Sequence, residues 1–229
     1  MIKVAYLDVG NLNLSKAYEL LPKSRKDKVD KFRFDKDKKL SAGAYLLLDK
    51  MLKEENITEP DFKIGKYGKT YISNHEDIHF NLSHSGKMVL CAISDREVGA
   101  DIEHIDPTID LNIAKHYFYN SEYENIMNAK NPPDEFFRYW VLKESYMKYT
   151  GLGMNLQLDS FEIIIEDEIK LKNDSKNLKF SLFDIENYKI AIAGHYDVSE
   201  LSELNYWTTL HKVIWLPCKN QNNFCWKSI

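Results

Sequence analysis

The segment from Phe136 to Thr150 combines charged and large apolar side chains at spacings that fit one helix. Residues four apart lie on the same face of a helix, so Trp140, Glu144 and Lys148 form one stripe. Lys143 is expected on the charged face of the segment as well. A carboxylate beside an ammonium could accept a proton and stabilise negative charge in one reaction. Taken alone, an exposed ion pair of about 0.3–0.5 kcal/mol is the simpler explanation.

A second pair of carboxylates lies in a segment with the character of a β-strand, from Val98 to Glu103. Side chains alternate along a strand, so Asp101 and Glu103 point to one face and Ala100 and Ile102 to the other. Two like charges repel each other unless water surrounds them or a cation bridges them. Their oxygen ligands suit Mg²⁺ or Mn²⁺, and a solvated strand edge is the alternative.

Hydroxyl and imidazole groups follow another short strand, in the segment from Phe80 to Gly86. At the transition from strand to loop, Ser83, His84 and Ser85 could donate several hydrogen bonds to a phosphate. The alternative is a purely structural turn in which His84 is buried and its hydrogen bonds are satisfied.

Composition limits what the whole chain can do. It has 229 residues, of which 44% are hydrophobic and 13% aromatic, so it can bury a sizeable core. The net charge of −4 argues against general binding to nucleic acid or to an acidic membrane surface. No apolar run approaches the roughly 20 residues that span a bilayer, and the N-terminus begins as a strand rather than a signal peptide. We therefore expect a cytoplasmic protein.

The cysteines and the C-terminal tail carry weaker signals. Cys91, Cys218 and Cys225 lack metal-ligand spacing and fit reduced thiols, and Cys91 is expected to fill core. The tail from Ser199 to Ile229 contains Trp207, Trp215 and Trp226 without a dominant period, and we expect it to pack on the core or to contact a partner.

Periodicity and turn residues predict the elements that position these groups. A strand is expected over Ile2–Val9, followed by one helix over Leu21–Lys53 whose first half is basic. Met88–Ser94 and Val98–Ile105 are expected to form a hairpin around Asp95–Glu97. Ser121 is the expected N-cap of its helix, and Gly151 is expected to end the last one. The other expected strands are Phe62–Ile64, Tyr71–Ile72, Ile78–Leu82, Phe161–Ile165, Ile169–Leu171, Leu178–Phe183 and Tyr188–His195, and the other helices are Leu111–Phe118, Ser121–Ala129 and Pro133–Tyr149.

The order of helix followed by antiparallel strands occurs twice and predicts an α+β fold. We expect two pseudo-twofold-related lobes, over residues 1–106 and 107–198, followed by a tail over residues 199–229. Each lobe packs a long helix on a small antiparallel sheet, and the active site lies in the cleft between the lobes.

Five motifs in this order resemble the 4′-phosphopantetheinyl transferases of the large, two-lobed Sfp type, over approximately residues 20 to 195. They are the basic segment of the first helix, Tyr67-Gly68-Lys69, Phe80 to Gly86, Gly99 to Glu103, and Trp140 to Lys148. The last three together form a specific signature, far beyond any one of them.

The resemblance implies an enzyme that transfers the 4′-phosphopantetheine arm of coenzyme A, its co-substrate, to a serine of an acyl or peptidyl carrier protein and releases adenosine 3′,5′-bisphosphate. Glu144 would accept the serine proton, directly or through a metal-bound water, and Lys148 would stabilise charge on the pyrophosphate. Carried over from the family, the ligands of Mg²⁺, with Mn²⁺ as the alternative, are Asp101, Glu103 and Glu144. The residues that would hold the coenzyme A phosphates are Arg25, Lys28, Ser41, Lys69, Ser83 and His84, and Lys148 would bind coenzyme A as well.

The partner surface and two other functions stay open at this point. The region from Ile113 to Met127, with Tyr117, Phe118 and Tyr123 and with Lys115 and Lys130 nearby, is a candidate platform for an acidic carrier protein, unless its aromatic residues are buried. The layout implies that a monomer builds the whole site. The alternatives are a divalent-metal phosphohydrolase that acts on coenzyme A or a nucleotide, and a non-catalytic coenzyme A-binding module.

Overall fold

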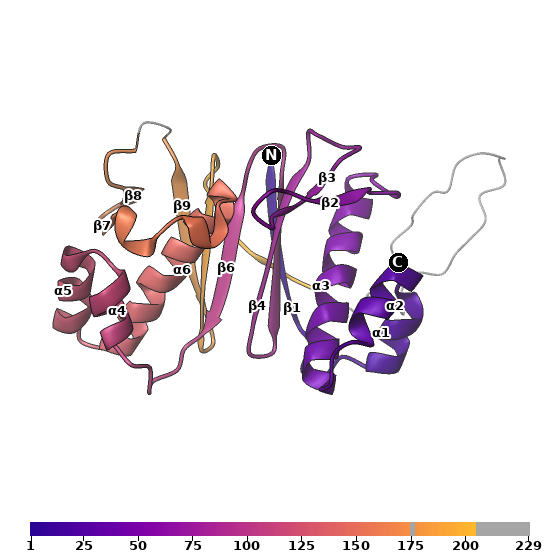
Figure 1. Cartoon of the computed structure of the whole chain (residues 1–229), viewed down its shortest axis with the longest axis horizontal. Coiled ribbons are helices and arrows are strands. Elements are labelled where there is room, and N and C mark those ends of the chain that lie inside the picture. Colours follow the sequence, from indigo (N-terminus) through magenta and orange to yellow (C-terminus); the bar gives the residue numbers. More distant parts are fainter. Residues whose placement is uncertain (175–176, 205–229) are drawn as a thin grey trace.

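The computed structural model describes residues 1–174 and 177–204, where helices and mostly antiparallel strands form a mixed α+β structure. Two sheets lie edge to edge, and each carries one long helix (Figure 1). The α+β class is therefore confirmed. No helix among the described residues is both long and apolar enough to cross a membrane.

The first sheet has the strand order β11-β1-β5-β4. Strand β5 (Met88–Ser94) lies between β1 (Ile2–Asp8) and β4 (His79–Ser85) and is antiparallel to both, whereas β11 (Ser202–Glu203) runs parallel to β1. Helix α3 (Asp35–Glu54) packs on this sheet. Its residues Leu46, Leu47 and Leu48 are fully buried, and each contributes about 1.5–3 kcal/mol by burial of its side chain.

The single helix predicted over Leu21–Lys53 is wrong, because the chain breaks there into separate helices. They are α1 (Leu14–Leu20), α2 (Lys23–Val29) and α3. Leu21 is extended, since a residue before proline is disfavoured in the helical region and Pro22 follows. Phe34 is extended as well, so that α3 starts in a new direction.

The second sheet has the strand order β6-β10-β9 and is antiparallel throughout. Its strands are β6 (Gly99–His104), β10 (Tyr188–Gly194) and β9 (Lys179–Ile185). Helix α6 (Pro132–Thr150) packs on this sheet and ends at Gly151, whose φ of +67° confirms the predicted helix stop.

The hairpin predicted between Met88–Ser94 and Val98–Ile105 is wrong. Strand β5 pairs with β1 and β4, while β6 pairs with β10 in the other sheet, so residues 95–97 connect the two sheets. The true hairpin joins β4 to β5 through Gly86, at a φ of +58°. A Cβ there would lie 2.4 Å from the Tyr188 Oη atom, so only glycine fits.

The remaining elements are short, and α4, α5, β7 and β8 lie around the second long helix, α6 (Figure 1). Tyr119, not the predicted Ser121, is the N-cap of α5, and the Glu122 side chain accepts a hydrogen bond from the Tyr119 backbone. Phe118 is buried and stacks on Phe136 with ring centroids 5.6 Å apart, so it is not part of a surface platform, whereas Tyr117 is exposed. The short elements are α4 (Asn112–Tyr117), α5 (Asn120–Asn128), β2 (Phe62–Ile64), β3 (Thr70–Ile72), β7 (Ile163–Ile165), β8 (Ile169–Leu171) and the 3₁₀ turns Gly153–Asn155 and Leu158–Ser160.

One apolar cluster joins the two sheets. It includes Leu90 of β5, Ala100 and Ile102 of β6 and Ile190 of β10, all of them buried. Cys91 is fully buried, which confirms that it fills core. The predictions for the tail beyond residue 204, with its tryptophans and with Cys218 and Cys225, lie outside the described residues.

Candidate active site

Polar side chains connect the edge strands β4 and β6 where the two sheets meet. The sheets share no backbone ladder among the described residues. Instead, the Ser83 hydroxyl donates to Asp101 Oδ1 at 2.8 Å, and the Ser85 hydroxyl donates to Glu103 Oε2 at 2.7 Å. Nearby, the Asn81 side-chain carbonyl accepts from the Ala100 backbone N–H. Alternate residues of β4 thus hold the carboxylates of β6 in place.

Helix α6 adds its stripe of side chains to this seam. Lys148 Nζ donates to Ser83 Oγ at 2.9 Å and to Asp101 Oδ1 at 2.5 Å. The helix can lie this close because residue 99 is a glycine. A Cβ at this position would lie only 1.9 Å from the Ser145 carbonyl oxygen. One pocket gathers the residues of all three elements, and its lining is Leu82, Ser83, His84, Asp101, Glu103, Trp140, Glu144 and Lys148. The prediction that Trp140, Glu144 and Lys148 share one face is confirmed.

Burial raises the pKa of two carboxyl groups of this pocket, those of Glu144 and Glu103. Burial raises the pKa of Glu144, the Asp101 charge raises it further, and the Lys148 charge opposes both. Burial also raises the pKa of Glu103, while the hydrogen bond from Ser85 opposes the rise. A carboxylate whose pKa is raised is a stronger base, which suits Glu144 to accepting a proton.

The donor set fits a hard cation such as Mg²⁺. Asp101 is 2% exposed, and its Oδ2 atom is buried without a hydrogen-bond partner. A buried carboxylate oxygen without a partner is costly, and a cation would satisfy it. Among the described residues, no group of three or more His, Cys, Asp and Glu side chains is itself arranged to hold a metal ion. Mg²⁺ commonly takes one or two carboxylates and completes its shell with water and substrate phosphates, so the residues fit the ion.

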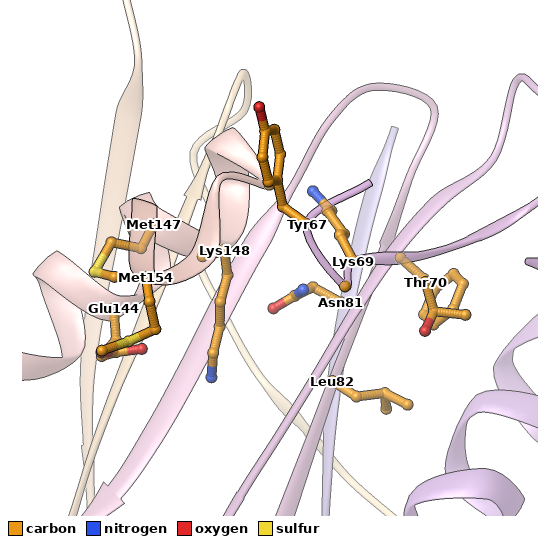
Figure 2. A pocket seen from close by; sticks show the side chains of 13 residues that line it. Tyr67, Lys69, Thr70, Asn81, Leu82, Glu144, Met147, Lys148 and Met154 are labelled. Carbon is orange, nitrogen blue, oxygen red and sulfur yellow. The ribbon is translucent and has the colours of Figure 1, made fainter. Parts of the chain in front are cut away.

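A second pocket adjoins the first and shares Glu144 and Lys148 with it. Figure 2 shows these two side chains and Met147 on α6, opposite the turn that carries Tyr67 and Lys69. The rest of the lining is largely apolar or glycine: Gly68, Thr70, Phe80, Asn81, Leu82, Gly151, Gly153 and Met154. The two pockets together offer an elongated ligand a charged end and a more apolar end.

The structure separates the predicted phosphate-binding residues into two places. Ser83, His84 and Lys148 lie together, as expected, and Lys69 lies in the adjoining pocket. Arg25 is on α2, with its guanidinium 5.0 Å from the Tyr45 ring centroid, and desolvation lowers its pKa. Neither Arg25 nor the other two predicted residues, Lys28 on α2 and Ser41 on α3, lines either of these pockets in the described parts of the chain.

Two features of the site were missed or misplaced by sequence reasoning. Lys143 is not on the charged face, because it is fully buried and pairs with Glu122 at 2.8 Å. Ser85 holds Glu103, but the prediction placed it in a loop. Extending the expected strand to residue 85 would have revealed it, because Asn81, Ser83 and Ser85 alternate with period two.

Two family models match adjacent parts of the chain. The model described as "4'-phosphopantetheinyl transferase, N-terminal" matches residues 11–96, and the model described as "4'-phosphopantetheinyl transferase superfamily" matches residues 97–193. Together they cover both halves of the candidate site. The boundary between the two matches falls in the segment that connects the two sheets.

Curated relatives agree with these matches. A 4′-phosphopantetheinyl transferase of Bacillus subtilis is 38% identical over 159 residues, which cover 65% of this chain and 70% of the relative. The 4′-phosphopantetheinyl transferase Sfp of Bacillus subtilis (strain 168) is 35% identical, over 61% of this chain and 65% of the relative. The 4′-phosphopantetheinyl transferase gsp of Aneurinibacillus migulanus is 42% identical, over 52% of this chain and 48% of the relative. The chain thus spans between about half and 70% of the length of these relatives.

Proposed function

The chain belongs to the 4′-phosphopantetheinyl transferase superfamily, and we propose that it transfers the 4′-phosphopantetheine arm of coenzyme A to a serine hydroxyl of an acyl or peptidyl carrier protein. The transferase class follows from the family. The observation that carries the proposal for this chain is the convergence of Asp101, Glu103, Glu144 and Lys148 on one pocket between the two sheets.

The transfer requires an in-line displacement at the pyrophosphate of coenzyme A. The carrier serine oxygen forms a bond to the phosphorus that bears pantetheine, and the bond from that phosphorus to the bridging oxygen breaks. Adenosine 3′,5′-bisphosphate leaves with the electron pair of the broken bond. The reaction therefore needs a base for the serine proton and positive charge at the pyrophosphate oxygens.

Glu144 and Lys148 meet these two needs. Glu144 has a pKa raised by burial, so it accepts the serine proton as the new bond forms. Lys148 already donates to Ser83 and Asp101, which fixes its ammonium at the pocket, where it stabilises charge on the pyrophosphate. Ser83 and His84 line the same pocket, and we keep both as phosphate-binding residues. The Ser83 hydroxyl would have to give up its hydrogen bond to Asp101 in order to donate to a phosphate.

Asp101, Glu103 and Glu144 are the residues that would hold Mg²⁺, or Mn²⁺ as the alternative. When bound, the ion supplies charge neutralisation at the pyrophosphate oxygens. The partnerless Asp101 Oδ2 atom is the structural support for this assignment. Ser83 and Ser85 hold two of the three carboxylates, those of Asp101 and Glu103, in position.

Coenzyme A would occupy both adjoining pockets. The charged end with Lys148 suits the pyrophosphate, and the wall from Tyr67 to Thr70, which includes Lys69, suits an uncharged part of the molecule. Arg25, Lys28 and Ser41 lie outside these pockets and would contact a more distant phosphate. One observation supports a phosphate-binding role for Arg25. Its guanidinium packs on the rings of Tyr45 and Phe62, and no carboxylate of the described residues lies within ion-pair distance of it.

The organisation of the chain supports the remaining proposals. A long helix followed by an antiparallel hairpin occurs with α3, β4 and β5 and again with α6, β9 and β10, which supports pseudo-twofold-related lobes. We keep the division into residues 1–106, 107–198 and 199–229, although β6 belongs to the sheet of the second lobe. One chain supplies every proposed catalytic group, which supports a monomer, and we propose a cytoplasmic location.

The first test is intact-mass spectrometry of an apo carrier protein after incubation with this chain, coenzyme A and Mg²⁺. We expect the mass of the carrier to rise by one phosphopantetheine group. The gain should disappear with EDTA and with Glu144→Ala. Glu135→Ala is the matched control, because Glu135 lies on the same helix but pairs with Arg138 away from the pockets.

Two outcomes would contradict the proposal. Hydrolysis of coenzyme A at the same rate with and without carrier would indicate a phosphohydrolase. Binding of coenzyme A without any turnover across acyl and peptidyl carriers would indicate a non-catalytic binding module. A mass gain that persists in EDTA would contradict the metal assignment alone.

A further inference from the structure

The Lys69 ammonium is fully engaged by protein acceptors. Its Nζ atom lies 2.6 Å from Glu97 Oε2, 3.2 Å from the Val98 carbonyl oxygen and 3.3 Å from the Tyr149 carbonyl oxygen. A lysine ammonium has three N–H donors, so these acceptors account for all of them. The side chain is 20% exposed.

These acceptors come from the elements that carry the catalytic groups. Tyr149 is in the last turn of α6, one residue from its end, where carbonyl groups lack helical partners and attract cations. Val98 directly precedes β6, the strand of Asp101 and Glu103. Glu97 is in turn held by His79 of β4, whose Nδ1 atom lies 3.2 Å from Glu97 Oε1.

Close packing accompanies these bonds. Gly151 has a φ of +67°, and a Cβ there would lie 3.2 Å from the Lys69 Cδ atom. Gly153 has a φ of +54°, and a Cβ there would lie 3.3 Å from the Tyr67 carbonyl oxygen. Two turns from different halves of the molecule, residues 65–70 and 151–153, therefore lie in contact and form one wall of the second pocket.

We infer that Lys69 is a positioning residue that fixes the pocket wall from Tyr67 to Thr70 against the end of α6, and that its charge is not used on a coenzyme A phosphate. Lys69, Glu97, Val98 and Tyr149 form what we call the Lys69 cluster. The inference refines the proposed coenzyme A site and rests on it for the identity of the ligand. It reassigns a residue that the family resemblance places among the phosphate ligands.

Lys148 provides the internal comparison. It donates to two acceptors, Ser83 Oγ and Asp101 Oδ1, so one of its three donors stays available to a substrate oxygen. In Figure 2 the ammonium group of Lys148 points down in the view and that of Lys69 points up, so the two point in opposite directions. The two lysines line one pocket but face different partners.

Neutralising Glu97 distinguishes a Lys69 that binds a phosphate from a Lys69 that holds the pocket wall, because the two roles predict opposite changes in the KM for coenzyme A. If Lys69 bound a phosphate, Glu97 would compete with it, and Glu97→Gln would lower the KM for coenzyme A. If Lys69 holds the wall, Glu97→Gln weakens the cluster, lowers Tm and leaves that KM unchanged or raised. Glu97 is half-exposed, so this variant retains its fold.

The experiment compares Lys69→Met, Glu97→Gln and Lys63→Met with the wild-type protein. Lys63→Met is the matched control, because Lys63 lies on β2 and forms an exposed ion pair with Asp61. For Lys69→Met we expect Tm to fall by roughly 2–4 °C without ligand and the KM for coenzyme A to rise about fivefold, with kcat within twofold of wild type. Glu97→Gln should lower Tm by less than Lys69→Met does. The double variant with both substitutions should have a Tm close to that of Lys69→Met alone.

Three results would overturn the inference. They are a lower KM in Glu97→Gln, an unchanged Tm in both cluster variants, and a lower Tm in Lys69→Met without any change in KM. If Lys69→Met does not fold, the directions in which Tm and the KM for coenzyme A change in Glu97→Gln decide between the two roles of Lys69. If the wild-type protein transfers nothing to any carrier, the proposed function fails, while the Tm values and calorimetric binding of adenosine 3′,5′-bisphosphate still test the Lys69 cluster.

Discussion

Helix α6 carries two lysine–carboxylate pairs that serve different purposes. Lys143 pairs with Glu122 at 2.8 Å, and the two side chains are 0% and 1% exposed. Lys148 pairs with Asp101 at 2.5 Å, and these side chains are 28% and 2% exposed. The lysines are five residues apart, so they lie on different faces of the same helix.

The Lys143 pair has every hydrogen bond that it needs. Lys143 also donates to the carbonyl oxygens of Leu158 and Phe161, each at 2.8 Å. Glu122 accepts from the backbone N–H groups of Tyr119 and Ile163. Three stretches of the chain, residues 119–122, 143 and 158–163, meet at this pair, and neither of the two pockets described above includes Lys143 or Glu122 in its lining. It holds the packing of α6.

The Lys148 pair is incomplete. Asp101 Oδ2 is buried without a partner, and the Lys148 ammonium faces a pocket that it shares with Glu144. A buried carboxylate with an unsatisfied oxygen is costly to the fold, so it persists where a ligand can satisfy it. The contrast teaches that a charged pair on this helix indicates a reactive site when one of its polar atoms has no hydrogen-bond partner. The depth of burial alone does not indicate one.

The largest effect on folding is expected from breaking the completed pair. Lys143→Met leaves the Glu122 carboxylate buried without a counter-charge, and we expect the free energy of unfolding to fall by about 3–5 kcal/mol. Chemical denaturation measures this loss. Adding Glu122→Gln should recover a large part of it, because the buried charge is then removed. A loss below about 1 kcal/mol in Lys143→Met would break the comparison.

The next effect concerns catalysis rather than folding. Lys148→Met removes the charge at the pyrophosphate, and we expect kcat to fall by about a hundredfold or more. Its cost in unfolding free energy should be less than half that of Lys143→Met, because pocket water can replace the ammonium and Ser83 still donates to Asp101. Initial rates of carrier modification and denaturation of the same samples measure both quantities. A kcat within twofold of wild type would contradict the role of Lys148.

A smaller effect tests the unfinished carboxylate directly. Mg²⁺ together with adenosine 3′,5′-bisphosphate should stabilise the wild-type protein by about 2.7 kcal/mol at a ligand concentration one hundred times its Kd, and so raise Tm. Asp101→Asn should lose more than half of this Tm increase, because the partnerless oxygen loses its charge. Asp110→Asn, in an exposed turn, is the control. An undiminished Tm increase in Asp101→Asn would contradict the metal assignment.

Sequence patterns predicted the stripe of Trp140, Glu144 and Lys148 because its signal is local. Helical spacing places Trp140, Glu144 and Lys148 on one face, and strand alternation places Asp101 and Glu103 on another, whatever the rest of the chain does. Gly151 could be predicted as a helix stop for the same reason. The sequence could not show that these faces meet, which depends on packing between sheets.

Most of the wrong predictions concern contacts between residues that are far apart in the sequence. A turn at residues 95–97 fits a hairpin locally, but β6 completes the second sheet and β5 the first, so the pairing was decided by tertiary contacts. Lys143 looks like its charged neighbours in the sequence. It can be buried because it pairs with Glu122, 21 positions earlier, and donates to the carbonyl oxygens of Leu158 and Phe161. The break at Leu21 carried a local signal in Pro22 that the apolar and basic pattern outweighed.

The smallest expected effect comes from Ser85, which belongs to the seam but not to the reacting groups. Its hydroxyl donates to Glu103 Oε2 and accepts from the His104 backbone N–H at 3.0 Å. Ser85→Ala should lower the free energy of unfolding by about 0.5–1.5 kcal/mol, and it should raise the Mg²⁺ concentration for half-maximal rate because Glu103 loses its anchor. At saturating Mg²⁺, kcat should stay within twofold of wild type. A loss of kcat that Mg²⁺ does not restore would place Ser85 among the reacting groups, together with Lys148. Ser85 would then no longer count as a residue that only holds Glu103 in position.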